Sequence, residues 1–257
     1  MTLGETGAMS GEAASRSSID LPGRQEELAR KVMGTGTPVA VVLLNGRPLG
    51  VEWLAGAAPA ILEAWFPGTE AGHAVADVLF GRVNPGGKLP VTFPRTVGQV
   101  PIYYNAKRTG RPPDETNRYT SKYLDVPWTP LYRFGHGLSY TRFELKDLRL
   151  SASRTGASGS VGVSVTVHNA GDRRGDEVVQ LYVQDVVASV TRPEQELKGF
   201  RRVTLDPGES RRVEFTVGPE ELGFYGLDMT WVVEPGEFSV RVSNSSVGGL
   251  QGTFEVR

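Results

Sequence analysis

A loop near the N-terminus, residues 4–16, holds the residues best suited to chemistry. Its sequence is GETGAMSGEAASR, so Glu5, Glu12 and Arg16 lie among small side chains. Small residues let a backbone approach a ligand closely, and a carboxyl group such as that of Glu12 can act as a general acid or base. A nearby cation such as Arg16 would bias the protonation of that carboxyl group. Taken alone, the loop still favours two solvated glutamates over a catalytic one.

The sequence lacks the other common catalytic and cofactor motifs. It has no Cys, which excludes disulfides, thiolate metal sites and cysteine nucleophiles. His73, His136 and His168 do not have the spacing of metal ligands, and we expect them to serve packing or the surface. No phosphate-binding loop, dinucleotide-binding glycine motif or Gly-x-Ser-x-Gly elbow is present. We therefore predict no cofactor and no metal, and a chemistry that depends on carboxylates.

Charge and hydropathy exclude several classes of partner. The chain has 28 Lys and Arg against 29 Asp and Glu, a net charge of -1, which argues against nucleic acid as a partner. Its longest apolar stretch, residues 39–44, is far shorter than the roughly 18 residues of a membrane span. Acidic residues near the N-terminus, Glu5 and Glu12, do not fit a signal peptide. We expect a soluble chain with no membrane partner and no visible export signal, whose compartment stays unknown.

The first part of the chain, residues 1–105, has α/β character. Pro22 is placed to begin a helix that ends at Gly34, and the apolar run of residues 38–44 predicts a strand buried on both faces. A second helix is predicted over residues 70–80, with Thr69 as its cap and Gly81 as its end. A helix, a buried strand and a further helix are typical of an α/β layer arrangement.

The last part, residues 143–257, is predicted to be an antiparallel β-sandwich. Apolar residues alternate with polar ones in short runs separated by turn residues. The runs are residues 161–167, 177–184, 211–217, 238–242 and 254–256. Between the two parts, residues 106–142 are rich in Pro, Gly, Tyr and charge, and include Trp128. We predict an ordered connector there, with a substrate-contacting loop as the alternative.

Long motifs occur in a fixed order along the whole chain. They are GETGAMSGEAASR, IDLPGRQEELARKV, TPVAVVLLNGRPL, ILEAWFPGTEAGHAVADVLFGRVNPGGKLPVTFPRTVGQVP, TGRPPDETNRYTSKYLD, PLYRFGHGLSYTRFE, VVQLYVQD and ELKGFRRVTLDPGES. In these motifs the chain resembles the C-terminal portion of the glycoside hydrolase family 3 β-glucosidases. The resemblance covers essentially the whole sequence.

The resemblance implies a three-part enzyme with an N-terminal (β/α)8 barrel, an α/β sandwich domain and a C-terminal fibronectin type III-like domain. The family removes terminal non-reducing β-linked glucose, or a related sugar, with retention of configuration. The implied substrate is therefore a β-linked oligosaccharide or glycoside. The family's acid/base glutamate lies on a Ser-Gly-Glu loop, and this match gives the catalytic role to Glu12. Glu5 matches a Gly-Glu that ends the preceding strand, and we expect it to be structural.

The chain departs from the family in lacking the barrel. The family's nucleophile is a barrel aspartate in a motif resembling Ser-Asp-Trp, and no such motif exists in these 257 residues. A retaining enzyme needs that second carboxylate about 5 to 5.5 Å from the acid/base. We therefore expect an incomplete α/β sandwich domain, a missing N-terminal barrel portion as partner, and a chain inactive alone. A truncation and one half of a split enzyme both stay open, as does the choice of sugar and linkage.

A non-catalytic carbohydrate-binding or interaction module is the alternative function. Its support is the aromatic connector, because aromatic faces can stack on sugar rings. Trp128 is the candidate substrate-binding residue of that connector.

Overall fold

The computed structural model describes all 257 residues, Met1–Arg257, and the chain divides into two compact units. Unit 1 comprises residues 1–83, 91–102 and 123–132, and unit 2 comprises residues 84–90, 103–122 and 133–257. The predicted connector, residues 106–142, contributes to both units, and its boundaries remain predictions. None of the helices has the length and apolar character needed to cross a membrane.

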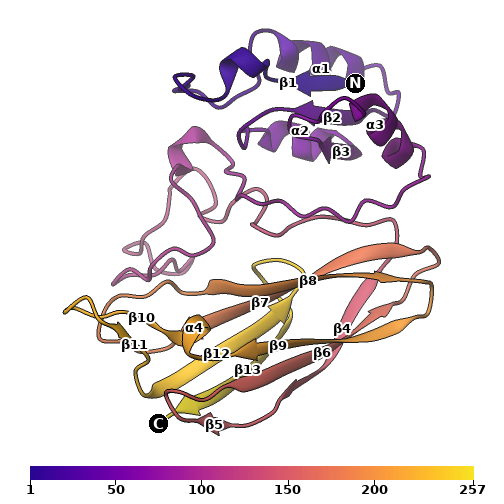
Figure 1. Ribbon diagram of the computed structural model, residues 1–257. Coiled ribbons are helices and arrows are strands. Elements are labelled where there is room, and N and C mark those ends of the chain that lie inside the picture. Colours follow the sequence, from indigo (N-terminus) through magenta and orange to yellow (C-terminus); the bar gives the residue numbers. More distant parts are fainter. The chain divides into compact units, whose positions relative to one another are not determined.

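Unit 1 is built on a parallel three-stranded sheet (Figure 1). Its strands β1 (Thr2–Gly4), β2 (Ala40–Leu44) and β3 (Ala60–Glu63) lie in the order β1-β2-β3, with β2 in the centre. Helices α1 (Gln25–Met33) and α2 (Glu52–Ala57) contribute Ala29 and Leu54 to the core of this sheet. The run of residues 38–44 is therefore a buried central strand, as its apolar sequence predicts.

Both predicted helices are present, but the residues predicted to begin the first and to cap the second are wrong. Helix α1 begins at Gln25 rather than Pro22, because Gly23 has a left-handed φ of 63° that no helix can include. Helix α3 (Ala71–Leu79) has Glu70 at its N-cap, and no side-chain hydrogen bond from Thr69 caps it. None of the residues of α3 is buried, although the helix is apolar. The short helix α2 has no strong sequence signal.

Unit 2 contains the sandwich, whose two antiparallel sheets have the orders β5-β13-β12-β7-β8 and β4-β6-β9, with β5 alone pairing in parallel (Figure 1). A small hairpin pairs β10 with β11. The elements are β4 (Phe143–Leu150), β5 (Arg154–Thr155), β6 (Val161–Asn169), β7 (Gly175–Asp185), β8 (Glu196–Leu205), β9 (Ser210–Val217), α4 (Pro219–Leu222), β10 (Phe224–Tyr225), β11 (Trp231–Val232), β12 (Gly236–Ser243) and β13 (Leu250–Val256). All five predicted runs are strands, so the α/β-then-all-β fold class is confirmed.

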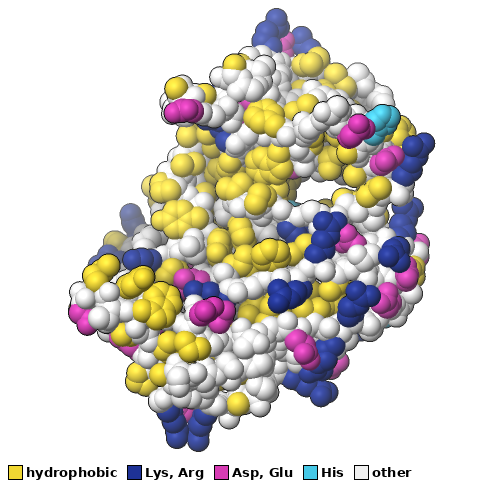
Figure 2. Space-filling model, viewed as in Figure 1, with side chains coloured by type: hydrophobic (Ala, Val, Ile, Leu, Met, Phe, Trp, Pro, Cys, Tyr) yellow, Lys and Arg dark blue, Asp and Glu magenta, His cyan; other side chains and the backbone are white.

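The core of the sandwich comes from alternate positions of these strands. Every second residue of β6 from Val161 to Val167 is buried, together with apolar residues of β7, β9, β12 and β13. Strands β4 and β8 were not predicted because charged residues interrupt their alternation. Several of those charged residues form ion pairs, for example the exposed Arg202 with Asp176 at 2.5 Å. Basic and acidic side chains are accordingly interspersed on the face shown in Figure 2.

A buried ion pair joins residues 84–90 to the sandwich within unit 2. Lys88 Nζ lies 2.8 Å from a carboxylate oxygen of Glu177 and donates to the Gly137 carbonyl at 2.9 Å. The two side chains are only 9% and 3% exposed. His136 lies in the same region, and burial, together with the charge of Lys88, lowers the pKa of its imidazole. The pair fixes a segment that forms no strand of its own.

Replacement of Lys88 should destabilise unit 2. K88A leaves the Glu177 charge buried without its partner, which costs about 3 to 5 kcal/mol. Urea denaturation followed by circular dichroism measures the effect. K146A, which removes an exposed lysine from the same unit, is the matched control and should leave the midpoint unchanged. Equal midpoints for K88A and the native chain would contradict the expectation.

Candidate active site

Three polar side chains lie at the carboxyl ends of the parallel strands of unit 1. Glu5 follows β1, Asn45 follows β2, and Glu63 is the last residue of β3. The pairings of β2 with β1 and with β3 bring these strand ends together. Open α/β sheets bind their ligands at this edge. The loop that carries Glu12 leaves the same edge, directly after β1.

Glu5 is the buried centre of an ion cluster. Its side chain is 0% exposed, and Arg16 Nη1 donates to Oε1 at 2.6 Å. Arg47, from the turn after β2, donates through Nε to Oε2 at 3.2 Å. Arg16 also donates to the Asp20 carbonyl at 2.9 Å. With both carboxylate oxygens engaged by arginines, Glu5 has the structural surroundings expected of it.

Glu12 lies at the exposed tip of the loop. The short 3₁₀ helix η1 (Gly7–Met9) precedes it, and a turn closes from the Ala14 N–H to the Gly11 carbonyl at 3.3 Å. Gly11 has a φ of 125°, which favours glycine, and Ala13 has a left-handed φ of 58°. Glu12 is exposed in this turn, whereas Glu5 at the start of the same loop is buried.

The turn after β2 supports the loop from the other side. Gly46 lies against the loop so closely that an added Cβ would be 2.1 Å from Ser10 Oγ. Arg47 donates from Nη2 to the Met9 carbonyl and, at 2.9 Å, to the Ala14 carbonyl. These contacts were not predicted, because Arg47 is 33 and 38 residues away from the two carbonyls.

Glu63 is the titratable group of this edge with the most perturbed surroundings. Burial raises the pKa of its carboxyl group from 4.5 to about 7, against hydrogen bonds from the Trp65 N–H and the Asn45 amide. Those bonds measure 2.9 and 3.3 Å. Asn45 Oδ1 is buried without a hydrogen-bond partner. In the sequence, Glu63 is one acidic residue within an apolar stretch, residues 58–66, and no pattern marks it as buried.

Trp128 lies in unit 1 on a segment held at both sides. The Pro127 carbonyl accepts from Gln99 Nε2 at 2.8 Å, and the Thr129 carbonyl accepts from Arg95 Nε at 2.9 Å. Trp128 is 39% exposed. No ring contact or hydrogen bond of the structure brings it together with Glu12.

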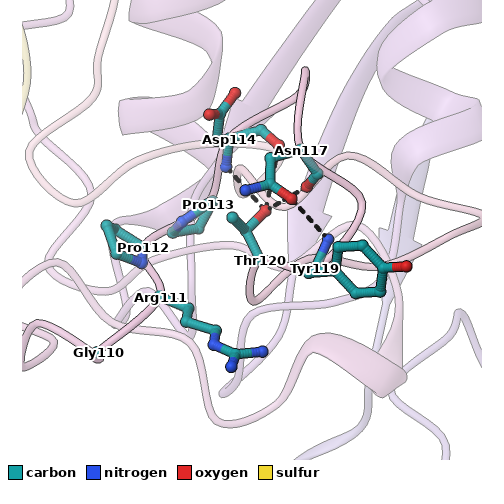
Figure 3. Close-up of a pocket in the computed structure, with 8 residues that line it drawn as sticks. All are labelled: Gly110, Arg111, Pro112, Pro113, Asp114, Asn117, Tyr119 and Thr120. Atoms are coloured by element: carbon teal, nitrogen blue, oxygen red, sulfur yellow. Dashed lines mark hydrogen bonds between the residues drawn. The ribbon is translucent and has the colours of Figure 1, made fainter.

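The connector also forms a hollow of about 640 Å³, lined by residues 110–114, 117, 119 and 120 (Figure 3). Local turns shape it: Tyr119 N–H donates to Asn117 Oδ1, and Thr120 Oγ1 donates to the Asp114 carbonyl. The Asp114 carboxylate accepts from the Thr116 N–H and hydroxyl, and these bonds lower its pKa. The hollow is therefore shaped by turns. Asp114 is the one carboxylate among its lining residues, so it lacks the paired carboxylates of a glycoside hydrolase. No cluster of three or more potential metal ligands is present in the chain.

The pKa of Glu63 makes the stability of unit 1 depend on pH. Because the folded-state pKa is about 7 and the ordinary value is 4.5, the folded state retains the proton in that interval. The protonated Glu63 carboxyl group therefore stabilises the folded state fully below pH 4.5, and this stabilisation is lost as the pH rises through about 7. E63Q should flatten the dependence of the melting temperature between pH 5 and 8. An unchanged slope in E63Q, measured beside the exposed control E70Q, would contradict this assignment.

Comparison with known proteins identifies two family domains along the chain. Residues 1–140 match the glycosyl hydrolase family 3 C-terminal domain, and residues 177–246 match the fibronectin type III-like domain. The periplasmic β-glucosidase of Salmonella typhimurium is 48% identical over 256 residues, which are 99% of this chain and 34% of that protein. A β-xylosidase of Formosa agariphila is 46% identical over 96% of this chain and 33% of its own length.

Solved structures of β-glucosidases are also similar to this chain over part of their length. The crystal structure of a β-glucosidase from Listeria innocua in complex with glucose superposes with a TM-score of 0.97 at 46% identity. It covers all of this chain, which in turn covers 36% of it. The chain thus spans about a third of the length of the curated relatives it matches. It belongs to glycosyl hydrolase family 3, and it corresponds to the C-terminal part of that family's β-glucosidases.

Proposed function

We propose that this chain supplies the general acid/base of a retaining β-glucosidase, and that Glu12 is that residue. The observation that carries the proposal is the exposed Ser10-Gly11-Glu12 turn, which leaves the carboxyl edge of the sheet on a loop held by two partly buried arginines. The Listeria relative binds glucose, and the Salmonella relative is named as a β-glucosidase. A terminal β-D-glucosyl residue is accordingly the proposed substrate, with a related sugar such as xylose as a variant of it.

The chemistry follows from what a single exposed carboxyl group can do. Protonated Glu12 donates its proton to the leaving glycosidic oxygen while a second carboxylate attacks the anomeric carbon. The resulting glycosyl-enzyme is hydrolysed when the Glu12 carboxylate removes a proton from water. Two inversions at the anomeric carbon give retention of configuration. Glu12 serves in both steps because it returns to its first protonation state.

The second carboxylate is proposed to come from the N-terminal portion that the relatives have and this chain does not include. Glu5 cannot serve as that nucleophile, because both of its oxygens are bound by arginines and its side chain is buried. We therefore propose that this chain alone does not hydrolyse glycosides. A sugar-binding module is the second candidate, favoured by the partly exposed Trp128 ring.

The test combines the chain with the N-terminal two thirds of the Salmonella relative. Hydrolysis of a chromogenic β-glucoside should appear only in the mixture or in a fusion of the two parts. E12Q should reduce turnover about 10²- to 10⁴-fold, the usual contribution of a general acid/base. E70Q, a change of another exposed glutamate, is the matched control and should leave turnover unaffected.

Three results would count against the proposal. They are turnover by the chain alone, full activity of E12Q in an active mixture, and no turnover in any combination that folds. Binding of cellobiose by the chain that survives E12Q and is lost in W128A would instead support the sugar-binding module.

A further inference from the structure

We propose that Arg47 is a positioning residue that holds the Glu12 loop in its catalytic place before any substrate binds. The proposal rests on the proposed function of Glu12 as the acid/base. Arg47 touches neither the Glu12 carboxyl group nor a reacting atom, and acts through the backbone on both sides of it. The contacts of its guanidinium group carry the inference.

One end of this guanidinium group is anchored in the protein. Arg47 Nε donates to the Glu5 carboxylate at 3.2 Å, and that side chain is fully buried at the end of β1. Arg16 binds the same carboxylate at 2.6 Å. The Arg47 side chain itself is only 20% exposed. Because β1 and β2 are paired in the sheet, the anchor belongs to the rigid part of unit 1.

The other end of the guanidinium group reaches the loop at two points. Nη2 donates to the Met9 carbonyl, three residues before Glu12, and to the Ala14 carbonyl, two residues after it. A single side chain therefore joins the two ends of the turn that carries Glu12. Only a guanidinium group has enough donors, in one plane, to bind a carboxylate and two carbonyls together. A lysine ammonium group at this position would keep the charge but lose part of these contacts.

The turn needs such support from outside, because its own backbone is strained. Ala13 has a φ of 58°, a conformation that costs an alanine on the order of 1 kcal/mol or more. Within the loop, the backbone hydrogen bonds are those of the Met9, Ser10 and Ala14 N–H groups. A loop with few internal bonds and one strained residue opens easily unless other contacts hold it. Arg47 supplies those contacts.

The position of the loop matters to catalysis because proton transfer depends on distance. A general acid must lie within hydrogen-bond reach of the leaving oxygen, and a displacement of about 1 Å can reduce the rate about 10²-fold. If Arg47 sets the position of Glu12, its loss should therefore impair the acid/base step more than the binding of the sugar. This consequence separates a positioning role from a general contribution to folding.

Hydrogen exchange of the 257-residue chain tests the positioning directly. In R47A, the Met9, Ser10 and Ala14 amides should exchange about tenfold faster or more, and by a larger factor than the amides of β2, while those of the sandwich stay unchanged. R47K should give an intermediate increase, and it provides the same comparison should R47A fail to fold. R82A removes an exposed arginine of unit 1 and is the matched control. Loop exchange in R47A and R47K equal to that of the native chain would overturn the proposal.

Activity in the fusion with the N-terminal portion provides the second readout. A phenyl β-glucoside needs protonation of its leaving group, whereas a dinitrophenyl β-glucoside does not. R47A should lower kcat/KM, which reports the step in which the leaving group departs, at least about tenfold more for the phenyl than for the dinitrophenyl glucoside, with partial recovery in R47K. Equal losses on both substrates would indicate a merely structural role and overturn the inference.

The two readouts also separate this inference from the proposed function. E12Q is expected to leave loop exchange unchanged while it shows the same preference for the dinitrophenyl glucoside. If E12Q lacked that preference, Glu12 would not be the acid, and the proposed function would fail even with exchange as expected for Arg47.

Discussion

The Glu5 carboxylate, buried at the end of β1, requires cationic partners, because removing one partner of a buried ion pair costs about 3 to 5 kcal/mol. Arg16 and Arg47 satisfy it from two different segments, one at the far end of the Glu12 loop and one in the turn after β2. The need to neutralise one charge thus brings together the two ends of the Glu12 loop and the turn after β2, where Arg47 lies 42 residues from Glu5. The loop between Glu5 and Arg16 can then project a second, exposed carboxyl group.

The two glutamates of this loop consequently have opposite surroundings. Glu5 is enclosed and committed to arginines, whereas Glu12 lies at an exposed turn with its carboxyl group available. The parallel sheet makes this division possible, since it places the ends of β1, β2 and β3 at one edge. Asn45 and Glu63 occupy the same edge, and the raised pKa of Glu63 shows how far burial extends around it.

The fold class could be predicted because it depends on local patterns. Alternating valines predict β6, and the continuous apolar run of residues 38–44 predicts the central strand β2. Strand β8 escaped prediction because Lys198, Arg201 and Arg202 break its alternation, and only its pairing with β7 reveals it. Helix α1 begins later than Pro22 suggests, because one left-handed glycine outweighs a favourable proline.

The candidate site was predictable only in part. Glu12 was assigned through a resemblance to a family motif, not through its spacing alone. Arg47 lies 42 residues from Glu5, and no local pattern reveals a contact that only the β1–β2 pairing creates. The raised pKa of Glu63 likewise depends on tertiary burial. Residues whose function depends on a long-range partner were therefore the ones that the sequence did not reveal.

The central claim is that Glu12 donates and accepts the proton while another carboxylate forms the glycosyl-enzyme. The most direct measurement is the product formed by E12A, joined to the N-terminal portion, from an activated β-glucoside in the presence of azide. Without its base, the second step would be taken over by azide, and inversion of the glycosyl-enzyme would give β-glucosyl azide. The account predicts this β-glucosyl azide from E12A and none from the native sequence. An α-glucosyl azide would make Glu12 the nucleophile, and hydrolysis by E12A at the native rate without azide would remove Glu12 from the reaction.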